Sequence, residues 1–150
     1  MAFGPQSLDA QQFAHEVLEI SRVVRVVKGG RRFRFRATVV VGDRSGKIGF
    51  GISKSKDVQQ AIANAQAQAM KAIVTIPLTE GTIAREVKAK FKGASVLLKP
   101  ARPGTGVIAG GVIRIVADLA GIRDLVSKRY GSSSRISNAR ATIKALQSIA

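Results

Sequence analysis

The stretch RVVRVVKGGRRFRFRATVVVGDRSGKIGFGI, residues 22–52, decides the fold of the first half of the chain. Residues 33–41 alternate between apolar and polar side chains, which is typical of a strand with one buried face. Residues 22–27 are rich in β-branched side chains, and the glycines after them favour a hairpin turn over residues 28–31. A further glycine-containing turn leads to a third strand, residues 47–52. We therefore predict a three-stranded antiparallel meander.

The alternation assigns the side chains of the central strand to two faces. The open face is predicted to present Arg34 and Arg36. The opposite face is expected in the core and consists of Phe33, Phe35, Ala37, Val39 and Val41.

A helix is predicted over residues 57–74, directly after the meander. Its apolar positions recur with helical spacing, Asp57 suits the positive end of a helix, and Pro77 follows the end. The segment 76–80 looks like a junction between two domains. The stripe that we expect to face the sheet is Val58, Ala61, Ile62, Ala65, Ala69, Ala72 and Ile73.

The second half of the chain gives the order β-β-α-β-α. A Pro/Gly-rich loop, residues 100–111, separates the first hairpin from the first helix and is of a kind that usually carries function. The helix over residues 112–120 is favoured by its spacing and by Gly121 as a stop, although its β-branched content leaves a strand open. The remaining elements are strands over 82–91, 94–99 and 122–130 and a helix over 136–149. The fold class is thus α+β, with domains at residues 13–76 and 80–150.

The charge of the chain points to a polyanionic partner. There are 25 Lys and Arg against 9 Asp and Glu, a net charge of +16, and both halves of the chain are basic. A net charge this far from zero destabilises the folded chain through repulsion between its own charges. It is usually tolerated because a polyanion neutralises the charge. A membrane is a poor candidate, because no stretch reaches the roughly 18 apolar residues of a spanning helix. The most apolar segment, residues 107–120, is interrupted by Arg114 and Asp118. Nucleic acid is therefore the expected partner.

Catalytic chemistry is nearly absent from the sequence. The chain has no cysteine and a single histidine, His15, so we expect no thiol chemistry, no metal site and no cofactor. The first 21 residues lack Lys and Arg, which argues against a secretory signal and favours a cytoplasmic protein. We predict that the chain is not an enzyme.

One motif resembles a nucleotide-binding loop. The string GTGVIA, residues 104–109, matches the dinucleotide fingerprint, and Asp124 lies 20 residues after Gly104. However, the strand before it belongs to a hairpin and not to a parallel βαβ unit. The preferred interpretation is a backbone that packs closely against RNA or a neighbouring protein.

The basic residues carry the functional prediction. Residues 22–56 contain 11 basic residues and one acid, Asp43, on sequence that is predicted to be folded. With both phenylalanines assigned to the core, backbone and shape recognition of structured RNA is favoured over base stacking. The predicted RNA contacts are Arg22, Arg25, Lys28, Gly29, Gly30, Arg31, Arg32, Arg34, Arg36, Lys47, Lys54, Lys56, Lys88, Lys90 and Arg102.

Two long strings resemble one known family. VVRVVKGGRRFRFRATVVVGDRSGKIGFGISKSKDVQQAI is similar to the first domain of bacterial small-subunit ribosomal protein S five. GTGVIAGGVIRIVADLAGIRDLVSKRYGSSSRISNARATIKAL resembles the C-terminal signature of that family. The resemblance runs from about Phe13 to Ile149. It implies an N-terminal domain like the double-stranded-RNA-binding fold and a C-terminal ββαβα domain. Residues 13–21 could be helical by spacing, whereas the resemblance suggests that they lead into the first strand.

The resemblance also implies a role and partners. Family members bind small-subunit rRNA, hold the head and body of the subunit in relation, contact ribosomal proteins S four and S eight, and contribute to decoding accuracy near the region where mRNA enters. Lys28, Gly29, Gly30 and Arg31 match the hairpin loop that approaches rRNA near the spectinomycin pocket. The positions matching the S-four contact are Gly104, Gly106 and Arg114. A free regulator that binds double-stranded RNA would explain the first domain only, and a nucleotide-dependent enzyme would rest on the loop at Gly104 alone.

Overall fold

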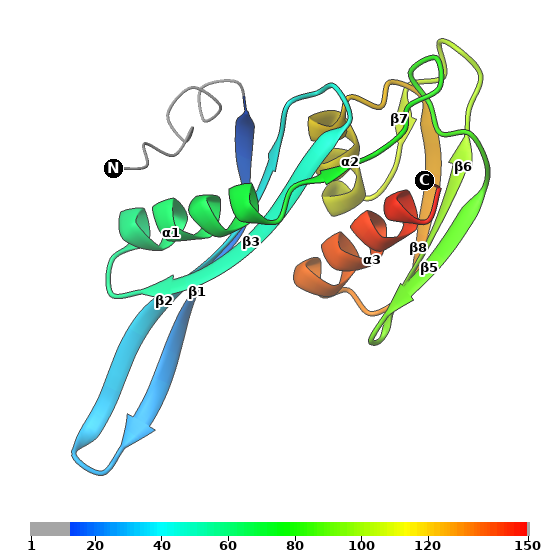
Figure 1. The fold of residues 1–150 in the computed structure, drawn as a ribbon. Helices are drawn as coiled ribbons and strands as arrows, with labels where there is room; N and C mark the ends of the chain where they lie inside the picture. The colour runs from blue at the N-terminus through cyan, green and yellow to red at the C-terminus, as the bar shows by residue number, and fades with distance from the viewer. Residues whose placement is uncertain (1–12, 150) are drawn as a thin grey trace, which may run out of the picture.

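The computed structural model describes residues 13–149, which form two four-stranded sheets and three helices (Figure 1). The first sheet and one helix form the N-terminal domain, and the second sheet and two helices form the C-terminal domain. This arrangement confirms the predicted α+β fold with two small domains. The elements are β1 (Ala14–Val27), β2 (Gly30–Gly42), β3 (Lys47–Ser55), α1 (Val58–Lys71), β4 (Val74–Thr75), β5 (Val87–Phe91), β6 (Ala94–Pro100), β7 (Val107–Ile108), α2 (Gly111–Ala120), β8 (Leu125–Gly131) and α3 (Arg135–Gln147).

The first sheet has the order β1-β2-β3-β4, and neighbouring strands are antiparallel. The meander was predicted, whereas the short strand β4 was not. Residues 14–21 belong to β1, which settles the open choice in favour of a strand. The pairing of β1 with β2 shifts register between Val17 and Glu19, where one extra residue is accommodated.

Helix α1 lies directly on this sheet because the facing residues on both sides are small. Its buried residues are Ala61, Ala65 and Ala69. A Cβ added at Gly51 would lie 2.1 Å from the Ala65 carbonyl oxygen, and one at Gly49 would lie 2.2 Å from the Ala69 carbonyl oxygen. Alanine and glycine thus let the helix backbone approach β3 closely. The predicted stripe is confirmed for Val58, Ala61, Ile62, Ala65 and Ala69, which are buried or half-buried. The helix ends at Lys71 and not at residue 74, so Ile73 lies outside it and Ala72 is its exposed C-cap.

Strands β1 and β2 extend beyond α1 as a two-stranded arm, residues 20–36, which projects from the body of the molecule (Figure 1). This arm corrects the predicted core. Phe33 is 43% exposed and Phe35 is only half-buried, whereas Ala37, Val39 and Val41 on the same face are fully buried. These residues do share one face of β2, as predicted, but α1 covers that face only from Ala37 onward. The two phenylalanines lie beyond its reach.

The second sheet has the order β5-β6-β8-β7. Its core residues include Val96 and Leu98, which pack with residues of α2 and α3 in one hydrophobic core. The predicted β-β-α-β-α order is present, with the short strand β7 added before α2. Strand β5 begins at Val87, later than the predicted start at residue 82. Strand β7 runs parallel to β8 and is joined to it through α2.

The two domains share a continuous core and meet at backbone positions occupied by glycine. The Arg44 N–H donates to the Leu119 carbonyl at 2.9 Å, and the Gly46 N–H donates to the Ala120 carbonyl at the same distance. Gly121 ends α2 with φ +87°, and a Cβ there would lie 2.1 Å from the Arg44 carbonyl oxygen. Because only glycine fits this approach, the sequence fixes the docking of α2 on the turn between β2 and β3.

Candidate nucleic-acid interface

The arm carries a basic face formed by alternate residues of β1 and β2. Arg25 pairs with Arg32 across the two strands, and Arg34 pairs with Val23 on the same face. Lys54 of β3 extends the row, because it pairs with Arg36. Residues two apart on a strand lie about 6.6 Å from each other on one face, so the cations follow a regular row. A hollow of about 500 Å³ lies along this row. It is lined by four basic residues and three valines: Arg25, Arg32, Arg34, Lys54, Val23, Val24 and Val27.

The charges on this face are not neutralised within the protein. Residues 20–36 contain no Asp or Glu. Among residues 13–149 the one ion pair found joins Arg44 and Asp118, which lie outside the arm. A row of unpaired guanidinium groups in an exposed hollow attracts phosphate, which arginine can bind through two parallel hydrogen bonds. We call this row, together with the arm that holds it, the basic arm.

Arg36 marks the point where the basic arm enters the body of the protein. Its side chain is only half-buried, yet its Nε is enclosed and has no hydrogen-bond partner in the protein. The open-face prediction therefore holds fully for Arg34, which is exposed, and only in part for Arg36. A buried donor without a partner is costly, so an acceptor brought by a ligand would stabilise this position.

The opposite face of the arm carries exposed apolar side chains together with Arg22 and Arg31. Val26 is 77% exposed, and Phe33 lies beneath the Arg22 guanidinium, whose carbon is 3.9 Å from the ring centroid. Such a cation–π contact contributes about 0.5–1 kcal/mol at an exposed site. Arg22 is therefore on the other face from Arg25, Arg32 and Arg34, and it orders the one aromatic ring near the end of the arm.

The tip of the arm is a tight turn of Lys28 and Gly29 between the paired residues Val27 and Gly30. Gly30 has φ +145°, a conformation that other residues rarely adopt, and a Cβ at either glycine would meet no atom within 4 Å. An approaching molecule can therefore contact the backbone of both glycines. Lys28 and Arg31 stand on either side of the two glycines and are exposed.

The other predicted RNA contacts are exposed but are not gathered on the arm. Lys47 begins β3 at the far end of the first sheet, opposite Thr75. Lys56 follows β3, whereas Lys88 and Lys90 lie on β5 of the second domain. Arg102 lies in the loop between β6 and β7. The prediction thus comprises one cluster and several separate sites.

The glycine loop at residues 104–109 does not have the geometry of a dinucleotide site. Val107 and Ile108 form β7, so both glycines precede a strand, whereas the fingerprint requires them between a strand and a helix. The Gly106 N–H donates to the Asp124 carboxylate at 2.9 Å. Asp124, which in a dinucleotide site would bind the ribose, instead accepts a hydrogen bond from the loop backbone. Gly104 and Gly106 both have positive φ, and Arg114 is exposed on α2.

No helix within residues 13–149 is long and apolar enough to cross a membrane. In the same range, no group of three or more His, Cys, Asp or Glu side chains is placed to hold a metal ion.

Comparison with known proteins agrees with this arrangement of domains. The family model described as "Ribosomal protein S5, N-terminal domain" matches residues 13–77, and "Ribosomal protein S5, C-terminal domain" matches residues 89–150. The small ribosomal subunit protein uS5 of Treponema pallidum (strain Nichols) is 47% identical over 144 residues, which are 96% of this chain and 84% of the relative. The protein of the same name from Treponema denticola is 48% identical over 135 residues, 90% of this chain and 78% of the relative.

The chain belongs to the ribosomal protein S5 family. This family is structural and not enzymatic. Within the fold, the fingerprint-like loop is held by the hydrogen bond from the Gly106 N–H to the Asp124 carboxylate.

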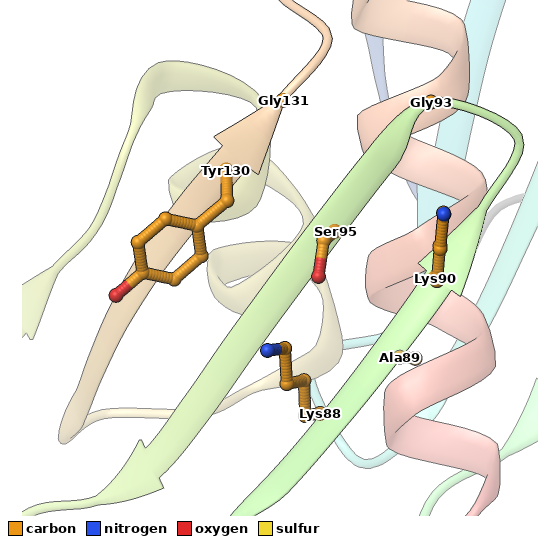
Figure 2. Close-up of a pocket in the computed structure, with 7 residues that line it drawn as sticks. All are labelled: Lys88, Ala89, Lys90, Gly93, Ser95, Tyr130 and Gly131. Atoms are coloured by element: carbon orange, nitrogen blue, oxygen red, sulfur yellow. The ribbon is translucent and has the colours of Figure 1, made fainter.

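Sequence reasoning missed a second exposed surface, on the C-terminal domain. Tyr130 of β8 is 49% exposed and lies with Ser95, Lys88 and Lys90 around a shallow hollow (Figure 2). Lys88 and Lys90 were predicted as RNA contacts, whereas Tyr130 and Ser95 were not. The missed signal was the alternation of β8, which places Tyr130 opposite to the buried Leu125.

Proposed function

We propose that the chain is a structural constituent of the small ribosomal subunit and binds small-subunit rRNA through the basic arm. The observation that supports the proposal is the row of exposed arginines, Arg25, Arg32 and Arg34, on an arm (residues 20–36) that contains no acidic residue. The chain works in the cytoplasm, within the ribosome, as its family implies.

The shape of the arm supports recognition of the RNA backbone. The guanidinium groups follow a narrow ribbon and are not arranged around an enclosed pocket, so they address phosphates along a groove or a strand. A phosphate oxygen is a suitable acceptor for the buried Nε of Arg36. The docked C-terminal domain holds the base of the arm, because its core is continuous with residues of the first sheet such as Val40 and Ile48.

The finer role follows from the resemblance together with this geometry. A projecting arm on a body made of two docked domains is suited to bridge two parts of a large RNA. We propose that the arm reaches rRNA between the head and body of the subunit and that the chain contributes to decoding accuracy near the region where mRNA enters. The loop with Gly104, Gly106 and Arg114 is the proposed contact with ribosomal protein S four, and a contact with S eight is proposed for the C-terminal domain.

The tip of the arm offers a direct test. Gly30→Asp places a side chain and a negative charge where a phosphate approaches, at a φ of +145°. We expect subunits that still assemble but respond differently to spectinomycin, measured after replacement of the chromosomal copy together with chemical footprinting of the head–body junction. Unchanged sensitivity with an unchanged footprint would remove the tip from the interface.

Two control variants separate the causes of any effect. Gly30→Ala introduces the backbone strain without the charge, and Gly29→Ala introduces neither, because Gly29 has no positive φ and an open surrounding. If charge is decisive, only Gly30→Asp changes the footprint. If Gly29→Ala acts equally, the turn and not the phosphate contact is responsible.

A further inference from the structure

The outward face of the second sheet combines lysines with an exposed aromatic ring. Along the strands, Lys90 pairs with Ser95 and Ser95 pairs with Tyr130, so these three side chains form one row across β5, β6 and β8. Lys88, Leu97 and Lys128 form the next row in the same way. The residues that alternate with them, such as Val96 and Leu98, are buried beneath α2 and α3.

Lys88, Lys90 and Ser95 of these rows line a shallow, open hollow beside Tyr130. The ring lies against the face of the sheet, the Ser95 hydroxyl lies beside it, and the Lys88 ammonium points toward the ring (Figure 2). The Lys88 Nζ is 5.9 Å from the ring centroid, within cation–π range. Tyr130 remains 49% exposed, so its side chain is accessible to a further partner.

The charge of this face selects the partner. Strands β5, β6, β7 and β8 contain no Asp or Glu, whereas on this face β5 carries Lys88 and Lys90, β6 carries Lys99, and β8 carries Lys128. A sheet surface with basic residues around an aromatic ring is the arrangement by which proteins bind unpaired nucleotides, with the base stacked on the ring and the phosphates held by the cations.

We propose that this face binds an unpaired segment of RNA, with one base stacked on Tyr130 and the adjacent phosphates held by Lys88 and Lys128. The proposal rests on the proposed function, because the RNA is that of the small subunit. It adds a second site with a different chemistry: the basic arm recognises backbone, and the second sheet accepts an unstacked base. Ser95 is placed to donate a hydrogen bond to the base or the ribose.

The first test compares the full chain with its Tyr130→Leu and Tyr130→Phe variants. The probe is a fluorescent, unpaired ten-nucleotide RNA, with a blunt RNA duplex as the second probe, and affinity is measured by anisotropy. Loss of one stacked base predicts roughly a tenfold weaker binding of the unpaired RNA by Tyr130→Leu. Tyr130→Phe keeps the ring and should stay within about twofold of the wild type. Duplex affinity should be unchanged in both variants.

The salt dependence separates stacking from charge. Tyr130→Leu should leave the log–log salt slope unchanged, because it removes no ionic contact. Lys88→Gln should lower the slope by about 0.7, the value for one phosphate contact on a single strand. Lys71→Gln on α1 removes the same charge from an exposed position outside this face and should leave the slope for this probe unchanged.

A third measurement uses the assembled particle. Short-wavelength crosslinking of small subunits that contain the wild-type chain should join Tyr130 to an rRNA base, and Tyr130→Leu should abolish that product. Wild-type affinity of Tyr130→Leu for unpaired RNA, or loss of a neighbouring protein from its subunits with the rRNA footprint unchanged, would refute the stacking site. In that case the basic arm and its duplex affinity stand, so the two proposals fail separately.

Discussion

The two ends of strand β2 share one sequence pattern and have opposite environments. From Ala37 to Val41 every residue is fully buried, whereas Arg31 to Arg34 are exposed on both faces. The alternation of side chains continues unchanged through both ends. The difference teaches that alternation reports which face a residue occupies, and that the elements packed on the strand decide whether the face is buried.

The covering elements differ between the two faces at the buried end. Helix α1 covers the face of Val39 through its alanines, and the C-terminal domain covers the face of Val40. A Cβ at Gly42 would lie 2.3 Å from the Leu119 carbonyl oxygen, so this end of β2 touches the second domain through its backbone. The exposed end of β2 lies beyond both α1 and the C-terminal domain, so its side chains are accessible to a ligand.

The largest expected effect concerns the docking of the two domains. Gly121→Val combines a strained φ of +87° with a side chain that would overlap the Arg44 carbonyl. Strain and overpacking together should lower the free energy of unfolding by about 3 kcal/mol or more. Urea denaturation measures the loss. Gly29→Ala at the arm tip is the control and should change stability by less than about 0.5 kcal/mol.

Substitutions at the exposed end of β2 should weaken RNA binding and leave the stability of the fold unchanged. Arg32→Glu with Arg34→Glu should weaken rRNA binding by roughly 100-fold, because two phosphate contacts become repulsions, and should lower the log–log salt slope by about 0.7–0.9 per contact. Arg36 is left intact because its side chain is half-buried at the base of the arm, so a change there could also alter stability. Circular dichroism should show an unchanged fold.

Lys71→Glu is the charge-reversal control for this experiment, because Lys71 lies at the end of α1, outside the arm. If it weakens rRNA binding as much as the arm variant, net charge alone governs affinity. In that case the row of arginines has no special role.

The sequence predicted the elements well because their periodicities are strong and local. The meander, α1, α2 and α3 all lie where the spacing of apolar residues indicated. Strands β4 and β7 contain two residues each and carry no such period, so they were missed. The length of the arm could not be predicted either, because it depends on where α1 ends on the sheet, which is a tertiary property.

The site was predicted in charge but not in arrangement. Arginines and lysines were identified from composition, and the arm gathers some of them while others lie elsewhere. Phe33 was assigned to the core because an apolar residue on an alternating strand is usually buried. Tyr130 was overlooked because a single tyrosine in a strand is equally typical of a core. Only packing distinguishes the two cases.

A paired substitution measures the contrast between the two ends of β2. Val39→Ala removes buried methyl groups and should cost about 2 kcal/mol, including the cavity. Phe33→Ala removes a larger side chain from an exposed position and should cost about 1 kcal/mol or less, including its contact with Arg22. Both values come from urea denaturation of the full chain. A larger loss for Phe33→Ala would mean that the arm is packed against the body in solution.

The smallest expected effect lies at the edge of the domain contact. Asp118 and Arg44 form an ion pair with 3.6 Å between Oδ2 and a guanidinium nitrogen, and both side chains are 63% exposed. Exposed pairs contribute about 0.2–1 kcal/mol, and an acid near the C-terminal end of α2 opposes the helix dipole. Asp118→Ala should therefore change stability by no more than about 0.5 kcal/mol in either direction.

This small value is informative because the same turn also makes the backbone contacts of the interface. The Arg44 N–H donates to the Leu119 carbonyl whatever side chain stands at position 118. If docking depends on backbone fit at the glycines, Gly121→Val is severe and Asp118→Ala is nearly neutral, with the same result at low and high salt. A loss near 2 kcal/mol for Asp118→Ala that disappears in high salt would instead assign the docking of the domains to electrostatics.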